Sequence, residues 1–524
     1  MGLMRVYRAS VSSGFPPPEI PVVRVDHVVA KVAAFYEKIR SIVGWTEEHL
    51  IRKTAIARIL RRTLALHSDA PELAETLVRD LVRGGYFPNG SIPVAKVSGL
   101  EAVLGKYLIL FEMLKKLSLG EQASLREWLI DIAGCEVEAY LDPPEKEEAL
   151  LAFMTEHMRR RIKIEDSLRD EDRENLIFIA VRQALFKFDE SIITYQFIKK
   201  YAPFWGSFRP DKDVESLRSF GEGIQRWRSG IKAAFGHSAL NKIYWAVEAL
   251  DSPYLILGDV FSSRAKTGEL DEAFVSDTEA LESAAKRAYR ERLKKQKRKA
   301  FRAAIYSTIS IFSSKVLIAF LVEVPFDRYI GQYSEETLIA NIAIPPVLMV
   351  LIVLWGLRRP PGKNESRVIE EVRRIIAGDI AAYPLKLKSK RSILIRGFVV
   401  LLYALGGAAT FGAMIYLLTL YNFSVLSQAI FIFFVSLIAW SGSKIREHAK
   451  ELVFGEKPPG FIHDLFLFFT FPIVAAGRWF SRQLLRIRPL ETILDVFIEL
   501  PFKFFVEFVE QWRAFLKEKK QEIH

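Results

Sequence analysis

The sequence predicts an all-α protein: a soluble, multi-helix N-terminal domain, a long basic stalk helix, and a helical membrane domain that crosses a bilayer four times. Three observations predict this class. Half of the 524 residues are hydrophobic, and the long apolar runs lie almost wholly after residue 300. Before residue 280, apolar residues recur at helical spacing and strand-like alternation is nearly absent. Lysine and arginine concentrate beside the apolar runs.

The net charge of +12 is distributed unevenly along the chain. Residues 1–280 contain 38 Lys/Arg and 41 Asp/Glu, a net of −3, whereas residues 281–524 contain 36 and 21, a net of +15. Basic proteins usually bind nucleic acid or membrane surfaces. Because the basic excess lies beside apolar runs, we expect a lipid bilayer with anionic headgroups as the partner, and no nucleic acid.

The first 275 residues divide into a leader and a helical domain. Residues 1–20 contain three consecutive prolines at 16–18 and are expected to form a flexible leader. Residues 21–275 are expected to form a cytoplasmic, all-helical domain, with the charged stretch 163–174 as a solvated loop between two subdomains. Beside two helices within residues 46–84, the periodic segments are 100–117, 124–141, 146–162, 174–188, 192–205, 214–235 and 239–250.

This half contains few residues that indicate chemistry. The single cysteine, Cys135, excludes an intrachain disulfide and a multi-cysteine metal site, and we expect it to be a buried apolar side chain. No two of the eight histidines are three or four residues apart, as helical metal ligands would be. The aromatic residues between 195 and 205 are read as core. We predict no catalytic, cofactor-binding or metal-binding residue. The possibility that the chain is a membrane enzyme of unrecognised type stays open.

Residues 276–302 are predicted to form the stalk. Ser276 and Glu279 fit a capping box, and neither Gly nor Pro occurs from there to Pro325. Ten Lys/Arg and one acidic residue lie between 286 and 302. The membrane domain is predicted at 303–460, with spans at about 303–322, 338–357, 395–420 and 425–440, each near the length that a hydrocarbon core requires.

The basic residues also predict an orientation. The stalk, the 358–396 segment with eleven Lys/Arg and the segment after 440 are basic, whereas 324–337 contains one arginine and 421–424 none. Because basic loops stay in the cytoplasm, the spans should form two hairpins with both termini cytoplasmic. Residues 461–524 are expected to comprise a re-entrant or interfacial segment at 461–477, followed by amphipathic helices on the membrane surface.

A candidate intramembrane polar site surrounds Lys315, which lies in the first span, where an unpaired charge is costly. Its expected partners are Glu323, Asn341 and the carbonyls that Pro345 and Pro346 leave without helical donors. A structural ion pair is the plainer interpretation, and an ion or proton pathway is the alternative. The residues expected to contact lipid headgroups are Lys294, Lys295, Lys297, Arg298, Lys299, Arg302, Arg478, Arg482, Arg486 and Arg488.

Four stretches of sequence resemble a family of uncharacterised multi-pass membrane proteins from small-genome bacteria. They are VRQALFKFDESIITYQFIKKYAPFW (181–205), LVEVPFDR (321–328), FPIVAAGRWFS (471–481) and LETILDVFIELPFK (490–503). The resemblance implies a bacterial inner-membrane setting and brings no activity, cofactor or binding residue with it.

Two functions fit this organisation. The leading hypothesis is a membrane-anchored, non-enzymatic interaction or scaffold protein, whose helical domain binds a protein partner at the cytoplasmic face of the inner membrane. Two features favour this hypothesis. The helical domain has no catalytic constellation, and a charged stalk connects it to the membrane domain. The alternative is a transporter or channel subunit that uses Lys315 and the proline-broken second span.

Overall fold

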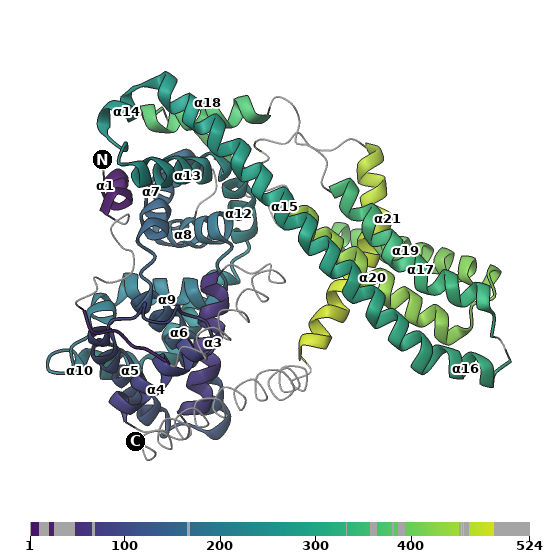
Figure 1. Ribbon diagram of the computed structural model, residues 1–524, viewed down its shortest axis with the longest axis horizontal. Helices are drawn as coiled ribbons and strands as arrows, with labels where there is room; N and C mark the ends of the chain where they lie inside the picture. The colour runs from purple at the N-terminus through teal and green to yellow at the C-terminus, as the bar shows by residue number, and fades with distance from the viewer. Residues whose placement is uncertain are drawn as a thin grey trace, which may run out of the picture.

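The computed structural model describes residues 2–9, 20–25, 48–64, 69–164, 168–331, 333–356, 364–379, 382–385, 393–449, 452, 454 and 461–486. These residues are overwhelmingly helical, which confirms the predicted class. Figure 1 shows a helical domain on one side and a helical bundle on the other, with the long helix α15 (Thr278–Ile318) running from one into the other. The described strands, β1 (Ile162–Ile164) and β2 (Tyr383–Leu385), form a short parallel pair.

The N-terminal domain packs around one continuous cluster of buried side chains. The segments expected as two subdomains therefore share a core. Its elements are α1 (Gly2–Ala9), α3 (Glu48–Thr63), α4 (Ala70–Arg83), α5 (Val94–Leu114), α6 (Leu119–Leu141), α7 (Glu145–Arg161), α8 (Asp170–Phe186), α9 (Glu190–Tyr201), a 3-10 turn (Pro203–Ser207), α10 (Val214–Glu222), α11 (Ile224–Phe235), α12 (Leu240–Glu248), α13 (Ser252–Thr267) and α14 (Glu272–Ser276).

Three expectations about this domain were wrong. The leader is not flexible throughout, because residues 2–9 form α1, and Met4 and Tyr7 on one of its faces are buried in the core. The stretch 163–174 is not a loop throughout, because α8 begins at Asp170, where three acidic residues suit the positive end of the helix dipole. Gly223 divides the single helix expected at 214–235 into α10 and α11.

A buried polar network centres on Glu136 in the domain core. Its carboxylate accepts hydrogen bonds from Lys106 Nζ at 2.5 Å, Tyr107 OH at 2.6 Å and Trp205 Nε1 at 2.9 Å. Lys106 also donates to the carbonyl of Trp205 at 2.8 Å. A buried charge is tolerated only with such partners. The fully buried Trp205 confirms that this part of the aromatic segment belongs to the core.

Helix α15 is the stalk and continues into the first span. Its N-cap is Asp277, whose side chain accepts from the amides of Glu279 and Ala280, so the capping box expected at Ser276 was one residue too early. After Ile318 the chain forms a π-helical turn (Ala319–Glu323) and then α16 (Val324–Tyr329). Pro325 lies in the first turn of α16, where a missing amide hydrogen is tolerated.

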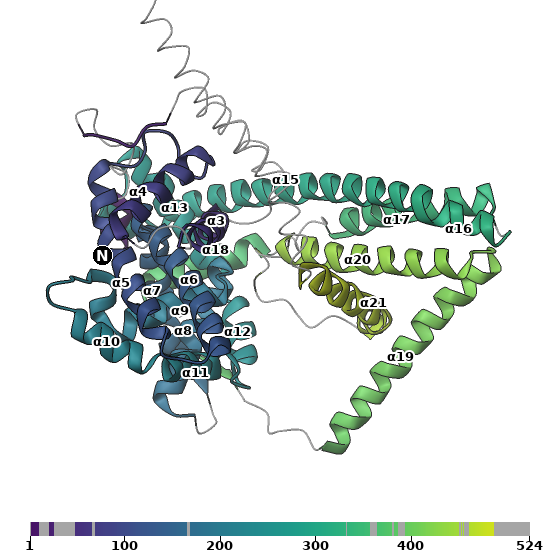
Figure 2. The same ribbon diagram turned by 90° about the horizontal axis from the view of Figure 1, so that it is seen from below.

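The chain is a multi-pass membrane protein. Four helical segments are long and apolar enough to cross a bilayer: Thr278–Tyr329, Glu335–Ile352, Gly397–Leu420 and Val425–Lys444. They belong to α15–α16, α17 (Glu335–Gly356), α19 (Ile393–Leu420) and α20 (Val425–Ala449). In Figure 2, α15, α17 and α20 lie side by side, whereas α19 diverges from them.

Helix α21 (Phe461–Arg486) packs against α20 and α19. Gly477 faces the carbonyl of Ser436, and Gly406 of α19 faces the ring of Phe468, so neither site has room for a Cβ atom. The segment expected at 461–477 is thus part of one longer helix, and its re-entrant or interfacial placement stays a prediction. The amphipathic helices predicted after residue 490 lie outside the described residues.

Candidate functional sites

A buried polar cluster lies in the membrane bundle and joins three of its helical segments. Lys315 of α15 donates a hydrogen bond from Nζ to Oε1 of Glu323 at 2.6 Å. The other carboxylate oxygen of Glu323 accepts from Nδ2 of Asn341, on α17, and from Oγ of Ser427, on α20, at 3.2 Å. Ser427 Oγ also lies 3.1 Å from Oδ2 of Asp327, on α16. We call these five residues the intramembrane cluster.

The π-helical turn explains how Lys315 meets Glu323. In a regular α-helix, residues eight apart are offset by about 80° around the axis. A π turn holds an additional residue, which changes the face that the following residues present. Here the turn ends at Glu323, and the two side chains meet. Such turns occur frequently at functional sites, so this one marks the cluster as a candidate.

Burial makes these contacts energetically decisive. Lys315 and Glu323 are 0% exposed and Asn341 is 1% exposed. A lone lysine in the middle of a membrane span costs roughly 3 kcal/mol on insertion scales. The carboxylate of Glu323 offsets that cost, and the ring of Phe434, whose centroid lies 5.3 Å from the ammonium, adds a cation–π contact. The cluster therefore pairs a charge that would otherwise destabilise the bundle.

The structure brings together three of the five residues predicted for this site, namely Lys315, Glu323 and Asn341. The ammonium bonds to Glu323, while Pro345 is buried and Pro346 partly buried further along α17. Asp327 and Ser427 were not among the residues predicted from the sequence. Asp327 follows Glu323 by four residues, a spacing that places both on one helical face and that was available in the sequence.

The segments that follow the second and fourth spans are held at the N-terminal domain. Helix α18 (Asn364–Ala377) packs against α15 and α13, and Arg161 forms a buried ion pair with Glu371. Asn364 donates to the hydroxyl of Tyr289 at 2.8 Å and to the carbonyl of Leu452 at 2.7 Å. Its Oδ1 accepts from the amide of Phe454 at 2.9 Å. Both segments thus lie on the same side of the bundle as the N-terminal domain.

A basic groove of about 610 Å³ lies between α13 and α15. Six cationic side chains line it, namely Arg264, Lys266, Arg287, Arg292, Lys295 and Lys299, together with two acidic ones, Asp259 and Glu291. Arg264 and Arg292 form ion pairs, with Glu269 and Asp259 respectively. The groove reaches Ala300, and Phe301, the next residue of the stalk, is 52% exposed. It therefore opens where the stalk turns from basic to apolar.

The predicted headgroup residues are accessible wherever their side chains are described. Lys297 is partly exposed, and the others in this group are exposed: Lys294, Lys295, Arg298, Lys299, Arg302, Arg478 and Arg482. Arg486 ends α21, and nothing further is described of its side chain, while Arg488 lies outside the described residues. Of this group, only Lys295 and Lys299 line the basic groove.

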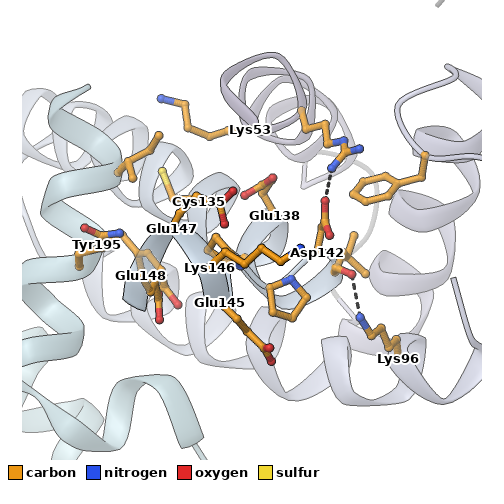
Figure 3. A pocket seen from close by; sticks show the side chains of 18 of the residues that line it. Lys53, Lys96, Cys135, Glu138, Asp142, Glu145, Lys146, Glu147, Glu148 and Tyr195 are labelled. Carbon is orange, nitrogen blue, oxygen red and sulfur yellow. Dashed lines mark hydrogen bonds and ion pairs between the residues drawn. The ribbon is translucent and has the colours of Figure 1, made fainter. Parts of the chain in front are cut away.

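A larger cavity of about 830 Å³ lies in the N-terminal domain (Figure 3). Its lining mixes four basic and five acidic side chains: Arg52, Lys53, Lys96 and Lys146, with Glu138, Asp142, Glu145, Glu147 and Glu148. Arg52 pairs with Asp142, and Lys96 donates to the carbonyl of Leu141 at 2.7 Å, as the dashed lines in Figure 3 show.

Cys135, which also lines this cavity, is a free cysteine, and its burial was predicted correctly. Burial raises the pKa of its thiol well above the usual range. A thiol that stays protonated at neutral pH is a poor nucleophile. The Cys135 thiol is therefore not an activated nucleophile in this cavity.

Comparisons with known protein families, with curated proteins and with solved structures give no match for this chain.

Proposed function

We propose that the chain is a membrane-anchored, non-enzymatic interaction protein that presents its helical domain to a protein partner. The observation that carries this proposal is the attachment of the domain to the bundle. The stalk α15 enters the bilayer, and α18, β2 and the contacts of Asn364 bind the returning segments to the domain. Such fixed attachment suits a domain that holds a partner at a set position relative to the membrane.

The mixed-charge cavity is the proposed contact with the partner. Glu145, which lines the cavity, is exposed, and the neighbouring lining residue Lys146 is partly exposed, so both are accessible to charged side chains of a polypeptide. Crosslinking and pull-down of the full chain from native membranes tests this. We expect Glu145→Lys to lose a crosslinked protein that the wild type retains. The matched control is Glu215→Lys, because Glu215 is highly exposed and does not line the cavity. Equal crosslinking by both variants would contradict the proposal.

We further propose that the domain faces the cytoplasm from a bacterial inner membrane, with both termini cytoplasmic. The basic character of the stalk and of residues 358–396 supports this orientation, since basic loops are retained on the cytoplasmic side. The resemblance to multi-pass proteins of small-genome bacteria supports the choice of membrane.

Anionic lipid is the second proposed partner, and the basic groove is its proposed site. The groove is lined by six cationic and two acidic side chains, and it lies where the stalk becomes apolar. This excess of positive charge suits a phosphate headgroup. Binding to nanodiscs that contain or lack anionic phospholipid, with native mass spectrometry of retained lipid, tests this. We expect Lys266→Gln with Lys295→Gln to lose retained anionic lipid. The same charge change at two exposed lysines outside the groove and away from the stalk, Lys212→Gln with Lys232→Gln, should retain it. Equal loss in both pairs would indicate general surface attraction instead.

The intramembrane cluster favours a second candidate function, that of a transporter or channel subunit. Lys315, Glu323 and Asn341 place charge and hydrogen-bonding groups inside the bundle, beside the proline-containing α17. Ion flux into liposomes that contain the full chain tests this function. Flux that Lys315→Ala abolishes, while circular dichroism shows that the variant keeps its helical content, would support transport over a purely anchoring role.

A further inference from the structure

We propose that Asp327 and Glu323 share one bound proton through the hydroxyl of Ser427, which makes the intramembrane cluster a proton-binding site. The inference goes beyond the anchoring function, and it does not depend on a protein partner or on transport. It rests on the contacts of the five cluster residues.

The hydroxyl of Ser427 lies between two carboxyl groups. Ser427 Oγ lies 3.2 Å from Oε2 of Glu323 and 3.1 Å from Oδ2 of Asp327, both within hydrogen-bond distance. A serine hydroxyl has a single hydrogen to donate, and an ionised carboxylate can only accept. With both acids ionised, the two carboxylates would have to divide this one hydrogen, whereas each contact is a full hydrogen bond if one carboxyl carries a proton and donates it to Ser427. The contacts then form a directed chain, from Asp327 Oδ2–H to Ser427 Oγ–H to Glu323 Oε2.

The charge of the cluster and its unpaired acceptors favour the same proton. One lysine and two carboxylates would give the cluster a net charge of −1 if both acids were ionised, and one proton makes it neutral. Two more buried oxygens, Oδ1 of Asp327 and Oδ1 of Asn341, have no hydrogen-bond partner within the described part of the chain. The cluster thus has more acceptors than donors. Two carboxyl groups that share one proton are a known solution where like charges lie close together.

The partners of each acid decide which one carries the proton. Glu323 accepts from the Lys315 ammonium and from Asn341, and both contacts stabilise its ionised form. Asp327 has only the Ser427 contact among the hydrogen bonds described. The proton therefore belongs on Asp327. Asp327 is also the more accessible acid, since it is partly exposed whereas Glu323 is 0% exposed, so it exchanges the proton with water.

Other charged groups near the cluster leave this balance unchanged. On α16, the Arg328 guanidinium lies 4.9 Å from the ring centroid of Tyr333. On α17, Glu335 and Glu336 occupy the exposed first turn. Helix α20 contains no charged residue before Lys444. Among the residues that the structure describes, Lys315 is therefore the positive charge in contact with the cluster, and its ammonium donates a hydrogen bond to Glu323.

Infrared spectroscopy of the full chain in lipid nanodiscs tests the proposal, because a protonated carboxyl has a carbonyl band that an ionised one lacks. We expect this band in the wild type at neutral pH. The band should disappear in Asp327→Asn and persist in Glu335→Gln. Glu335 is the matched control because it is an exposed carboxylate near the same end of the membrane bundle. In Ser427→Ala the band should shift, because the hydrogen bond that the carboxyl donates is lost.

Two results would overturn the proposal. One is a wild-type spectrum without a protonated carboxyl at neutral pH, and the other is a band that survives Asp327→Asn. Circular dichroism shows whether each variant keeps its helical content, and Ser427→Ala supplies an independent reading if Asp327→Asn does not fold. Because no partner protein is used, failure here is distinguishable from failure of the proposed interaction function.

Discussion

Replacing Glu323 by glutamine should destabilise the membrane bundle strongly, whereas replacing both members of its ion pair should not. In Glu323→Gln, the ammonium of Lys315 stays 0% exposed and loses the carboxylate that lies 2.6 Å away. Breaking a buried pair on one side costs about 3–5 kcal/mol, because the remaining charge is left uncompensated. This corresponds to a change of roughly a hundredfold or more in the ratio of folded to unfolded protein.

The double variant Lys315→Met with Glu323→Gln removes both charges and keeps similar side-chain volumes. Asn341 and Ser427 can still bond to the amide, so we expect stability near that of the wild type, or higher by about 1–4 kcal/mol. The assay is denaturant unfolding in detergent micelles, followed by circular dichroism, for the wild type, both single variants and the double variant. A double variant as unstable as Glu323→Gln alone would refute the ion-pair account.

Two further predictions concern the N-terminal domain. Residues 21–280 should express as a soluble, helical fragment. A fragment of residues 2–290 should be several kcal/mol more stable, because it adds the buried Tyr7, Leu281 and Tyr289. Equal denaturation midpoints for the two fragments would contradict this. Cys135 should react with a thiol reagent slowly at neutral pH and rapidly in denaturant, because burial both hides the thiol and raises its pKa; fast labelling of the native chain would show that the core is open.

The architecture was predictable where the signal was periodicity or length. Four apolar segments appear at the positions that hydropathy indicates, since a bilayer requires about 20 apolar residues per helix. One helix of the N-terminal domain that was not predicted, α13, is buried on all sides in its first half, which includes Tyr254, Ile256 and Leu257. An amphipathic pattern depends on one polar face, so a helix buried on all sides does not produce it.

Long-range contacts were less predictable than elements. Lys315 was found because a charge inside an apolar run is conspicuous, and its pairing with Glu323 follows from proximity along the helix. Ser427 lies 104 residues from Glu323 in sequence, and a serine near a helix start carries no distinguishing signal. The docking of α18 on the N-terminal domain depends on the Arg161–Glu371 pair, 210 residues apart, which local patterns do not reveal. Residues 364–377 were accordingly assigned to the membrane domain, although Val368 and Val372 pack in the N-terminal core.

We expect the chain to cross the membrane four times and to return twice to the side of the N-terminal domain. Single cysteines introduced in a Cys135→Ser background, and labelled in intact cells with a membrane-impermeant maleimide, test it most directly. Tyr421→Cys and Glu335→Cys, at exposed positions beside the two far turns, should label in intact cells. Asp379→Cys, an exposed position just after α18, should label only after the membrane is permeabilised. Labelling of Asp379→Cys in intact cells, or protection of Tyr421→Cys, would contradict the account.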